Sequence, residues 1–285
     1  MLLLARGLLK ADTHHGILCT LQHHNQPRRT LFPNRLLREG SSSAPHVRLI
    51  DRLYFAETVM NRQSFQIQLD ALTQDTLALG YAVANALHQA LKTLTTNDTD
   101  QMRAVIENDR NINATVAALR SRCLTMIARQ QPMASDLREI SVMLSLLPEL
   151  ERMADHAATI CKIGQRILAS PEAVPLQQMS GGIGPALTEM GSRTLVLLQH
   201  GLDAFARRDA AFAEQLCEED HAIDRLYKEL FAETIAISRT APHQSSQVIH
   251  LLTLAHNIER IGDRVTNLAE QIIFLLRGEV VELNS

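Results

Sequence analysis

The chain has 285 residues, of which 46% are hydrophobic and 21% charged, a balance typical of soluble globular proteins. A formal net charge of −3 provides no broad basic surface for nucleic acid, and aromatic residues, at 4%, are too few to stack bases. No apolar run approaches the roughly 18–20 residues that span a bilayer, and residues 1–9 are too interrupted for a signal peptide. We therefore expect a cytoplasmic protein that neither binds nucleic acid nor inserts into a membrane.

The beginning of the chain differs from the rest. Residues 1–59 show little sustained periodicity and are predicted to be a poorly ordered extension. A regular helical pattern starts near Met60 and predicts three long helices. These helices span roughly 65–93, 99–130 and 135–168. Asn97 or Asp98 is the expected N-cap of the second helix. The apolar stripe of the third consists of Ile140, Met143, Leu147, Leu150, Ala154, Ala157 and Cys161.

A segment rich in proline, glycine and serine, at 170–185, is predicted to be a linker. Three more helical patterns follow the linker. They span roughly 186–206, 209–238 and 243–277. Gly278 then suits a C-terminal stop. The four cysteines lie far apart without zinc-binding spacing, so we expect buried or free thiols in a reducing compartment.

The two halves of the chain repeat each other. The first and second helices of each half match at a constant offset of 111 residues. Matched pairs include Gly80 and Gly191, Leu91 and Leu202, and Asp109 and Asp220. The third helices match at an offset of 108, so that Asp155 corresponds to Asp263. The repeat predicts an all-α fold of two tandem three-helix bundles related by internal duplication, at 60–169 and 186–280.

Acidic pairs recur on the second and third helices of both halves. The motifs are Asp109-Arg-Asn-Ile-Asn113, Glu151-Arg-Met-Ala-Asp155, Asp220-His-Ala-Ile-Asp224 and Glu259-Arg-Ile-Gly-Asp263. Residues four apart share a helix face, where two carboxylates repel each other unless a cation lies nearby. Oxygen ligands from two neighbouring helices would suit a hard cation, iron or manganese. The alternative is a structural charge network with Arg152, Arg225 and Arg260.

The two halves differ as candidate metal sites. The second half offers four carboxylates, those of Asp220, Asp224, Glu259 and Asp263. The first half offers three, those of Asp109, Glu151 and Asp155, because Asn113 replaces the fourth. Pro148 is also expected to kink the third helix beside them. We therefore expect tighter binding in the second half, with both sites on the bundle surface because unpaired buried carboxylates are costly.

The acidic motifs resemble those of a known family. Leu150–Ala157 and Asn257–Arg264 look like the repeated signature ERIGDHA of PhoU proteins. The turn at Gln130–Arg138 and the motif Asp220–Asp224 resemble two further features of that family. The chain departs from the pattern at Asn113 in place of an acid, at Ala154 in place of glycine, at Thr159 in place of asparagine and at Arg264 in place of histidine.

The resemblance implies a pair of similar three-helix bundles and a regulatory adaptor rather than an enzyme. Family members repress phosphate-starvation signalling and modulate phosphate uptake by linking a phosphate ABC transporter ATPase to a sensor histidine kinase. Some bind iron or zinc clusters on the paired acidic motifs, so surface-bound iron, zinc or manganese is the expected cofactor. We also expect the chain to form a homodimer.

Two other functions stay open at this stage. An accessory protein of a different phosphate transporter would carry the same sequence features. A metal-dependent enzyme on a carboxylate bundle would use Glu-x-x-His pairs, whereas His156 directly follows Asp155. We therefore expect His156 to be a surface or interhelical hydrogen-bonding group.

Overall fold

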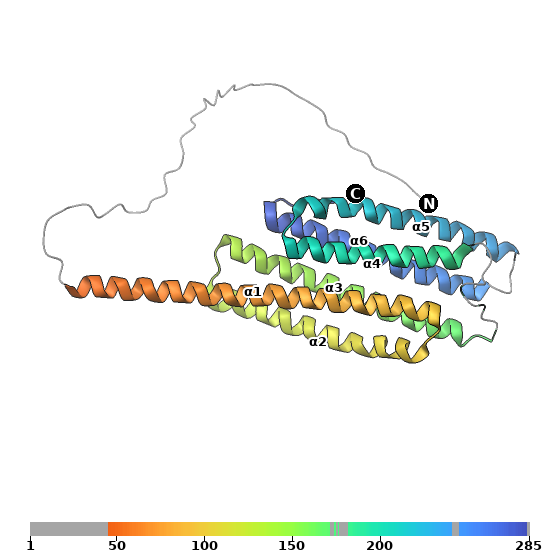
Figure 1. The fold of residues 1–285 in the computed structure, drawn as a ribbon, viewed down its shortest axis with the longest axis horizontal. Helices are drawn as coiled ribbons and strands as arrows, with labels where there is room; N and C mark the ends of the chain where they lie inside the picture. Colours follow the sequence, from red (N-terminus) through yellow and green to blue (C-terminus); the bar gives the residue numbers. More distant parts are fainter. Residues whose placement is uncertain (1–44, 172–173, 175, 177–181, 241–244, 284–285) are drawn as a thin grey trace, which may run out of the picture. The chain divides into compact units, whose positions relative to one another are not determined.

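The computed structural model describes residues 45–171, 174, 176, 182–240 and 245–283. Contacts divide the chain into a unit Met1–Asp51 and a compact unit Arg52–Ser285, and every contact discussed below lies in the second unit. The described residues form six α-helices and no strand, which confirms the predicted all-α fold. The helices are α1 (Pro45–Thr96), α2 (Thr99–Gln130), α3 (Ala134–Leu168), α4 (Ile183–Arg207), α5 (Ala210–Thr240) and α6 (Ser245–Arg277) (Figure 1).

The first helix begins earlier than the sequence pattern indicated. α1 starts at Pro45, so residues 45–59 of the expected extension are helical. Proline is favoured in a first helical turn, because that turn leaves its N–H groups unpaired in any case. No glycine or further proline follows before Gly80 that would stop the helix. The rest of the predicted extension, 1–44, lies outside the described residues.

The ends of the helices follow the local chemistry of the sequence. Asp98 caps α2 as predicted, and its Oδ1 accepts a hydrogen bond from the backbone N–H of Gln101 at 2.9 Å. α6 ends at Arg277, and Gly278 follows with a φ of 75°. α3 continues through Pro148, which lies inside the helix without ending it. In the described part of the chain, no helix has the length and apolar character that crossing a bilayer requires.

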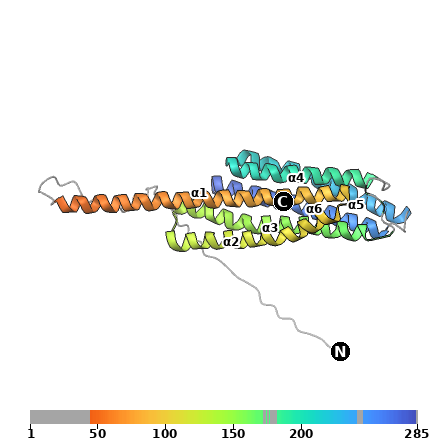
Figure 2. The same cartoon turned by 60° about the horizontal axis from the view of Figure 1, so that its bottom comes forward.

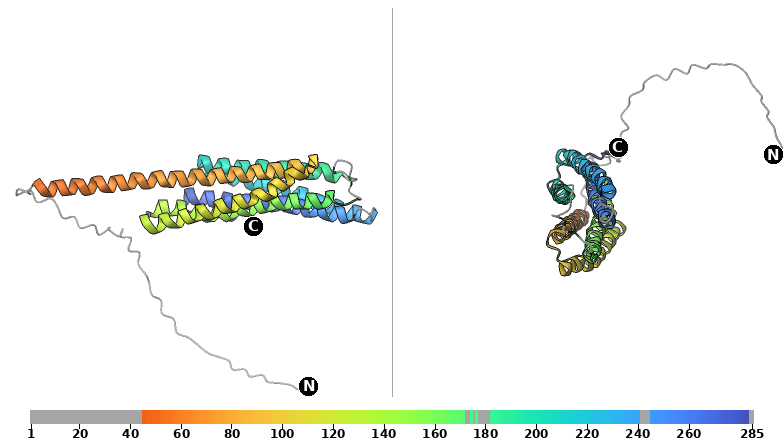
Figure 3. Two further views of the ribbon diagram at one scale, coloured as in Figure 1. Left: turned by 90° about the horizontal axis from the view of Figure 1, so that it is seen from below. Right: turned by 90° about the vertical axis from the view of Figure 1, so that its right-hand side faces the viewer.

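The predicted apolar stripes form a shared core. Every residue of the α3 stripe named above is buried, and Cys123 of α2 is buried with them. α2 packs on α3, whereas α4 and α5 pack on each other and on α6. Figure 2 and Figure 3 show α3 and α6 running side by side, and contacts between these two helices join the halves. The boundaries of two separate domains, with a linker at 170–185, stay a prediction.

The first helices of the two halves pack by reciprocal contacts. A Cβ atom at Gly80 of α1 would collide with Leu202 of α4. A Cβ atom at Gly191 of α4 would lie 2.6 Å from Cδ2 of Leu91 on α1. Because these residues are matched by the repeat, each half places its leucine over the glycine of the other. The contact has the self-complementary form of an isologous interface.

Candidate functional site

Three carboxylates meet between α5 and α6. Asp220 and Asp224 lie four residues apart on α5, and Asp263 lies on α6. Each offers one oxygen, and the three oxygens lie within 4.8 Å of one another. A cation with metal–oxygen distances of about 2.0–2.6 Å can bind oxygens at such a spacing. The structure thus gathers three of the four ligands predicted in the second half.

Gly262 lets Asp220 approach α6 closely. A Cβ atom at Gly262 would collide with Oδ1 of Asp220. The Asp220 carboxylate therefore lies against the helix backbone, and the residue is 2% exposed. The expectation that the acidic cluster lies on the bundle surface is wrong for this residue, because the missing Cβ provides room below the surface. A buried carboxylate beside two others fits a bound cation better than a solvated acidic face.

The fourth predicted ligand, Glu259, binds a neighbouring arginine. Nε of Arg260 lies 2.9 Å from Oε2 of Glu259, and Nη2 lies 3.1 Å from Oε1. The same Nη2 lies 2.6 Å from Oδ2 of Asp263. The charge network considered from the sequence is therefore present at Arg260, which contacts both carboxylates of its motif.

The carboxylate cluster keeps an excess of negative charge. The pKa of Asp263 is raised, first by burial and then by the charge of Glu259, although Arg260 and Arg264 lower it. The pKa of Arg260 is raised above its usual range, mainly by its hydrogen bond to Glu259. Arg260 thus stays charged beside Glu259 and Asp263 and offsets part of their negative charge.

The first half does not assemble the same cluster. Asn113 donates a hydrogen bond from Nδ2 to Oδ2 of Asp109 at 3.3 Å. Burial and the charges of Asp155 and Glu151 raise the pKa of Asp109, so these carboxylates lie near it. Among the described residues, no three ligand atoms of this half gather as they do in the second. Ala154 matches Gly262 in the repeat and is buried.

Sequence reasoning missed Glu149, a residue that joins the two halves. Its Oε2 accepts hydrogen bonds from Nδ2 of Asn267 at 3.1 Å and from Nη1 of Arg264 at 3.3 Å. Its Oε1 accepts from Nη1 of Arg152 at 3.2 Å. Arg152, expected beside the acidic pair of its own motif, thus binds Glu149. No motif marks Glu149, since a glutamate after a helical proline resembles any solvated acidic residue.

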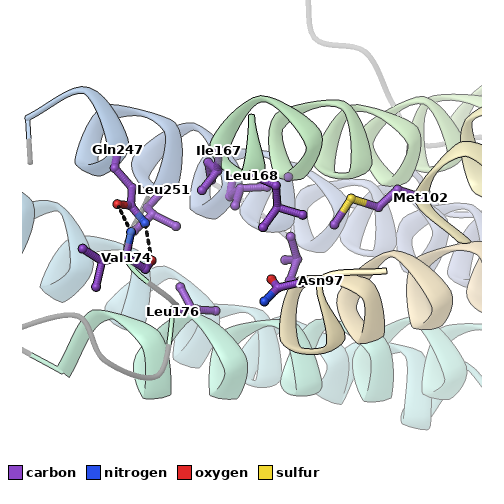
Figure 4. A pocket seen from close by; sticks show the side chains of 11 residues that line it. Asn97, Met102, Ile167, Leu168, Val174, Leu176, Gln247 and Leu251 are labelled. Atoms are coloured by element: carbon purple, nitrogen blue, oxygen red, sulfur yellow. Dashed lines mark hydrogen bonds between the residues drawn. The ribbon is translucent and has the colours of Figure 1, made fainter. Parts of the chain in front are cut away.

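A cavity of about 90 Å³ lies where the ends of several helices meet the segment between the halves. Figure 4 shows that Gln247 of α6 closes one side of it. The backbone N–H of Val174 donates to Oε1 of Gln247 at 2.9 Å, and Nε2 donates to the Val174 carbonyl at 2.6 Å. The described lining residues carry no charge and are mostly leucine, isoleucine and valine. The cavity therefore does not suit a phosphate ion.

Two matching sets of three helices, with a carboxylate cluster between α5 and α6, define a tandem three-helix-bundle protein with a candidate cation site. The PhoU domain family matches the chain twice, over residues 76–164 and 187–272. The chain belongs to the PhoU family, which confirms the resemblance seen in the acidic motifs.

Curated relatives and solved structures agree with this assignment. The phosphate-specific transport system accessory protein PhoU of Escherichia coli is 32% identical over 219 residues, which cover 75% of this chain and 86% of that protein. The PhoU homolog of Clostridium acetobutylicum is 29% identical over 226 residues, 79% of this chain and 100% of that protein. The crystal structure of PhoU from Pseudomonas aeruginosa has a TM-score of 0.69 at 30% identity and covers 75% and 100% of the two chains.

Proposed function

We propose that the chain is a regulatory accessory protein of a phosphate transport system. In this role it represses phosphate-starvation signalling and modulates phosphate uptake. The observation that supports the proposal is the double match to the PhoU domain family, over 76–164 and 187–272. Relatives matched over 86% and 100% of their own length are named as accessory proteins of phosphate-specific transport.

The proposed partners are a phosphate ABC transporter ATPase and a sensor histidine kinase, which the chain links in the cytoplasm as a homodimer. An adaptor of this kind needs matched surfaces rather than a catalytic pocket. The two halves offer similar but unequal surfaces, because the partly exposed Asp224 of the second half is matched by Asn113 in the first. Such unequal surfaces suit two different partners.

A deletion strain tests the regulatory role. With phosphate plentiful, we expect the deletion to derepress a phosphate-starvation reporter and to raise phosphate uptake. Expression of the wild-type chain in that strain should restore repression. Reporter activity and uptake at wild-type levels in the deletion strain would contradict the proposal.

Affinity purification of the tagged chain tests the partners. Recovery of a phosphate ABC transporter ATPase and a histidine kinase is the expected result. Recovery of a transporter of another class, without the ATPase, would support the second candidate, an accessory protein of a different phosphate transporter. Size measurement of the purified chain in solution should give twice the monomer mass of 31.7 kDa.

We further propose that the carboxylate cluster binds iron, manganese or zinc. The spacing of Asp220, Asp224 and Asp263 supports this, and Gly262 provides the room for the first of them. Glu259 would complete the ligand set. The bound cation would supply positive charge that fixes α5 against α6, because its ligands come from both helices.

A further inference from the structure

The guanidinium of Arg260 binds two of the four carboxylates proposed as metal ligands. It contacts both oxygens of Glu259 and one oxygen of Asp263. We propose that Arg260 is an internal cation which competes with metal for these carboxylates and thereby sets the metal affinity of the second half. The inference rests on the proposed metal binding at this cluster.

The contacts make the competition direct. An arginine fork that binds a carboxylate through two parallel N–H groups uses the lone pairs that a metal ion also needs. Nη2 of Arg260 bridges the two residues, at 3.1 Å from Oε1 of Glu259 and 2.6 Å from Oδ2 of Asp263. A metal ion bound to Asp263 would also repel the guanidinium at short range. Metal binding through all four carboxylates therefore requires Arg260 to leave.

Arg260 is placed where it can leave. Its side chain is 37% exposed, whereas the side chains of Glu259 and Asp263 are 13% and 24% exposed. The carboxylates are thus more buried than the arginine that binds them. A rotation of this long side chain into water displaces no residue of the core.

The matched arginine of the first half behaves differently. Arg152 corresponds to Arg260 in the repeat, but it binds Glu149, at 3.2 Å. The contact of Arg260 with its motif is therefore not imposed by the helix position alone. The contact of Arg260 with its own motif occurs in the half where three carboxylates gather, as expected for a cation attracted by their charge.

Titration of Mn²⁺ into the purified full-length chain, followed by calorimetry, tests the proposal. The informative variant is Arg260→Gln, which removes the competing charge from a partly exposed side chain. We expect Arg260→Gln to bind Mn²⁺ tighter by roughly tenfold or more, as loss of a charge-assisted hydrogen-bond pair predicts. Arg260→Lys keeps the charge but loses the fork, so its affinity should lie between those of Arg260→Gln and the wild type.

Two controls separate competition from other effects. Arg225→Gln removes one charge beside Asp224 on the exposed side of α5 and should change the affinity little. Asp224→Ala should abolish the tight site. Circular dichroism of each variant confirms that it is folded before its binding is compared.

Each outcome decides one of the two proposals. Tighter binding by Arg260→Gln alone supports competition, including the case in which the wild type binds too weakly to detect. Unchanged or weaker binding by Arg260→Gln, with a wild-type site that Asp224→Ala removes, overturns the role of Arg260 but keeps the metal site. Equal gains in Arg260→Gln and Arg225→Gln overturn it as well, in favour of a general charge effect. Absence of Mn²⁺ binding in every variant overturns the metal site itself.

Discussion

His156 of α3 and Asn257 of α6 meet across the boundary between the halves, with 2.9 Å between Nδ1 and Oδ1. The Asn257 amide nitrogen donates to the Thr253 carbonyl, so its oxygen faces the ring and accepts from Nδ1–H of His156. At the repeat offset of 108, His156 corresponds to Arg264 and Asn257 corresponds to Glu149. Arg264 and Glu149 also meet, with 3.3 Å between Nη1 and Oε2. The α3–α6 interface therefore contains one contact in two versions, a neutral pair and an ion pair.

The ion pair should matter more for stability than the neutral pair. Glu149→Ala would leave Arg264, which is 23% exposed, without its carboxylate partner. Removing one member of a partly buried pair costs more than a neutral hydrogen bond, so we expect a loss of about 2–3 kcal/mol for Glu149→Ala and about 1 kcal/mol for Asn257→Ala. Urea unfolding of both variants measures the difference, and equal losses would contradict this ranking.

His156 should make stability depend on pH. Its pKa is lowered from 6.5, mainly by burial and also by Arg264 and His256, although Asn257 and Asp155 act in the opposite direction. The unfolded chain then binds a proton more readily than the folded one just below pH 6.5. The contribution to stability is present above that pH and is lost as the pH falls through the folded-state pKa. The unfolding free energy of His156→Gln should fall less steeply over this range than that of the wild type, and parallel curves would contradict the assignment.

Gly262→Ala should displace Asp220. The new methyl group would collide with the Asp220 carboxylate, and overpacking costs typically 1–3 kcal/mol. Alanine gains about 1 kcal/mol in helix propensity over glycine, so we expect a small net loss of stability together with loss of bound metal. Ala154→Gly in the first half is the matched control and should lower stability without changing metal content. Retention of full metal content in Gly262→Ala would show that Asp220 is not a ligand.

Metal content should differ between variants of the two halves. We expect Asp224→Ala to remove more metal than Glu151→Ala, because the gathered carboxylates lie in the second half. Elemental analysis after separate reconstitution with iron, manganese and zinc measures the loss. Equal losses in the two variants would refute this asymmetry.

Much of the fold could be predicted from local patterns in the sequence. The stripe on α3 and the cap at Asp98 depend on residues within one or two turns, so periodicity was enough to find them. The early start of α1 was missed although apolar residues such as Leu49, Ile50 and Leu53 occur in that segment. The residues before Pro45 show no helical periodicity, and the segment was assigned to the extension together with them. The burial of Asp220 was missed for a different reason: it depends on Gly262, a residue of another helix. The role of Glu149 between the halves was missed likewise, because it depends on Arg264 and Asn267 of α6.

The reciprocal packing of Gly80 under Leu202 and of Gly191 under Leu91 has a consequence for how the chain is held together. Two separate copies of one three-helix chain, each with a glycine and a leucine at these positions, would make the same pair of contacts about a two-fold axis. The connection between α3 and α4 therefore joins surfaces that already match, and it raises their effective concentration rather than creating the fit. Once the copies are covalently joined, each can change separately without loss of its partner, which allows one half to hold a carboxylate cluster that the other lacks.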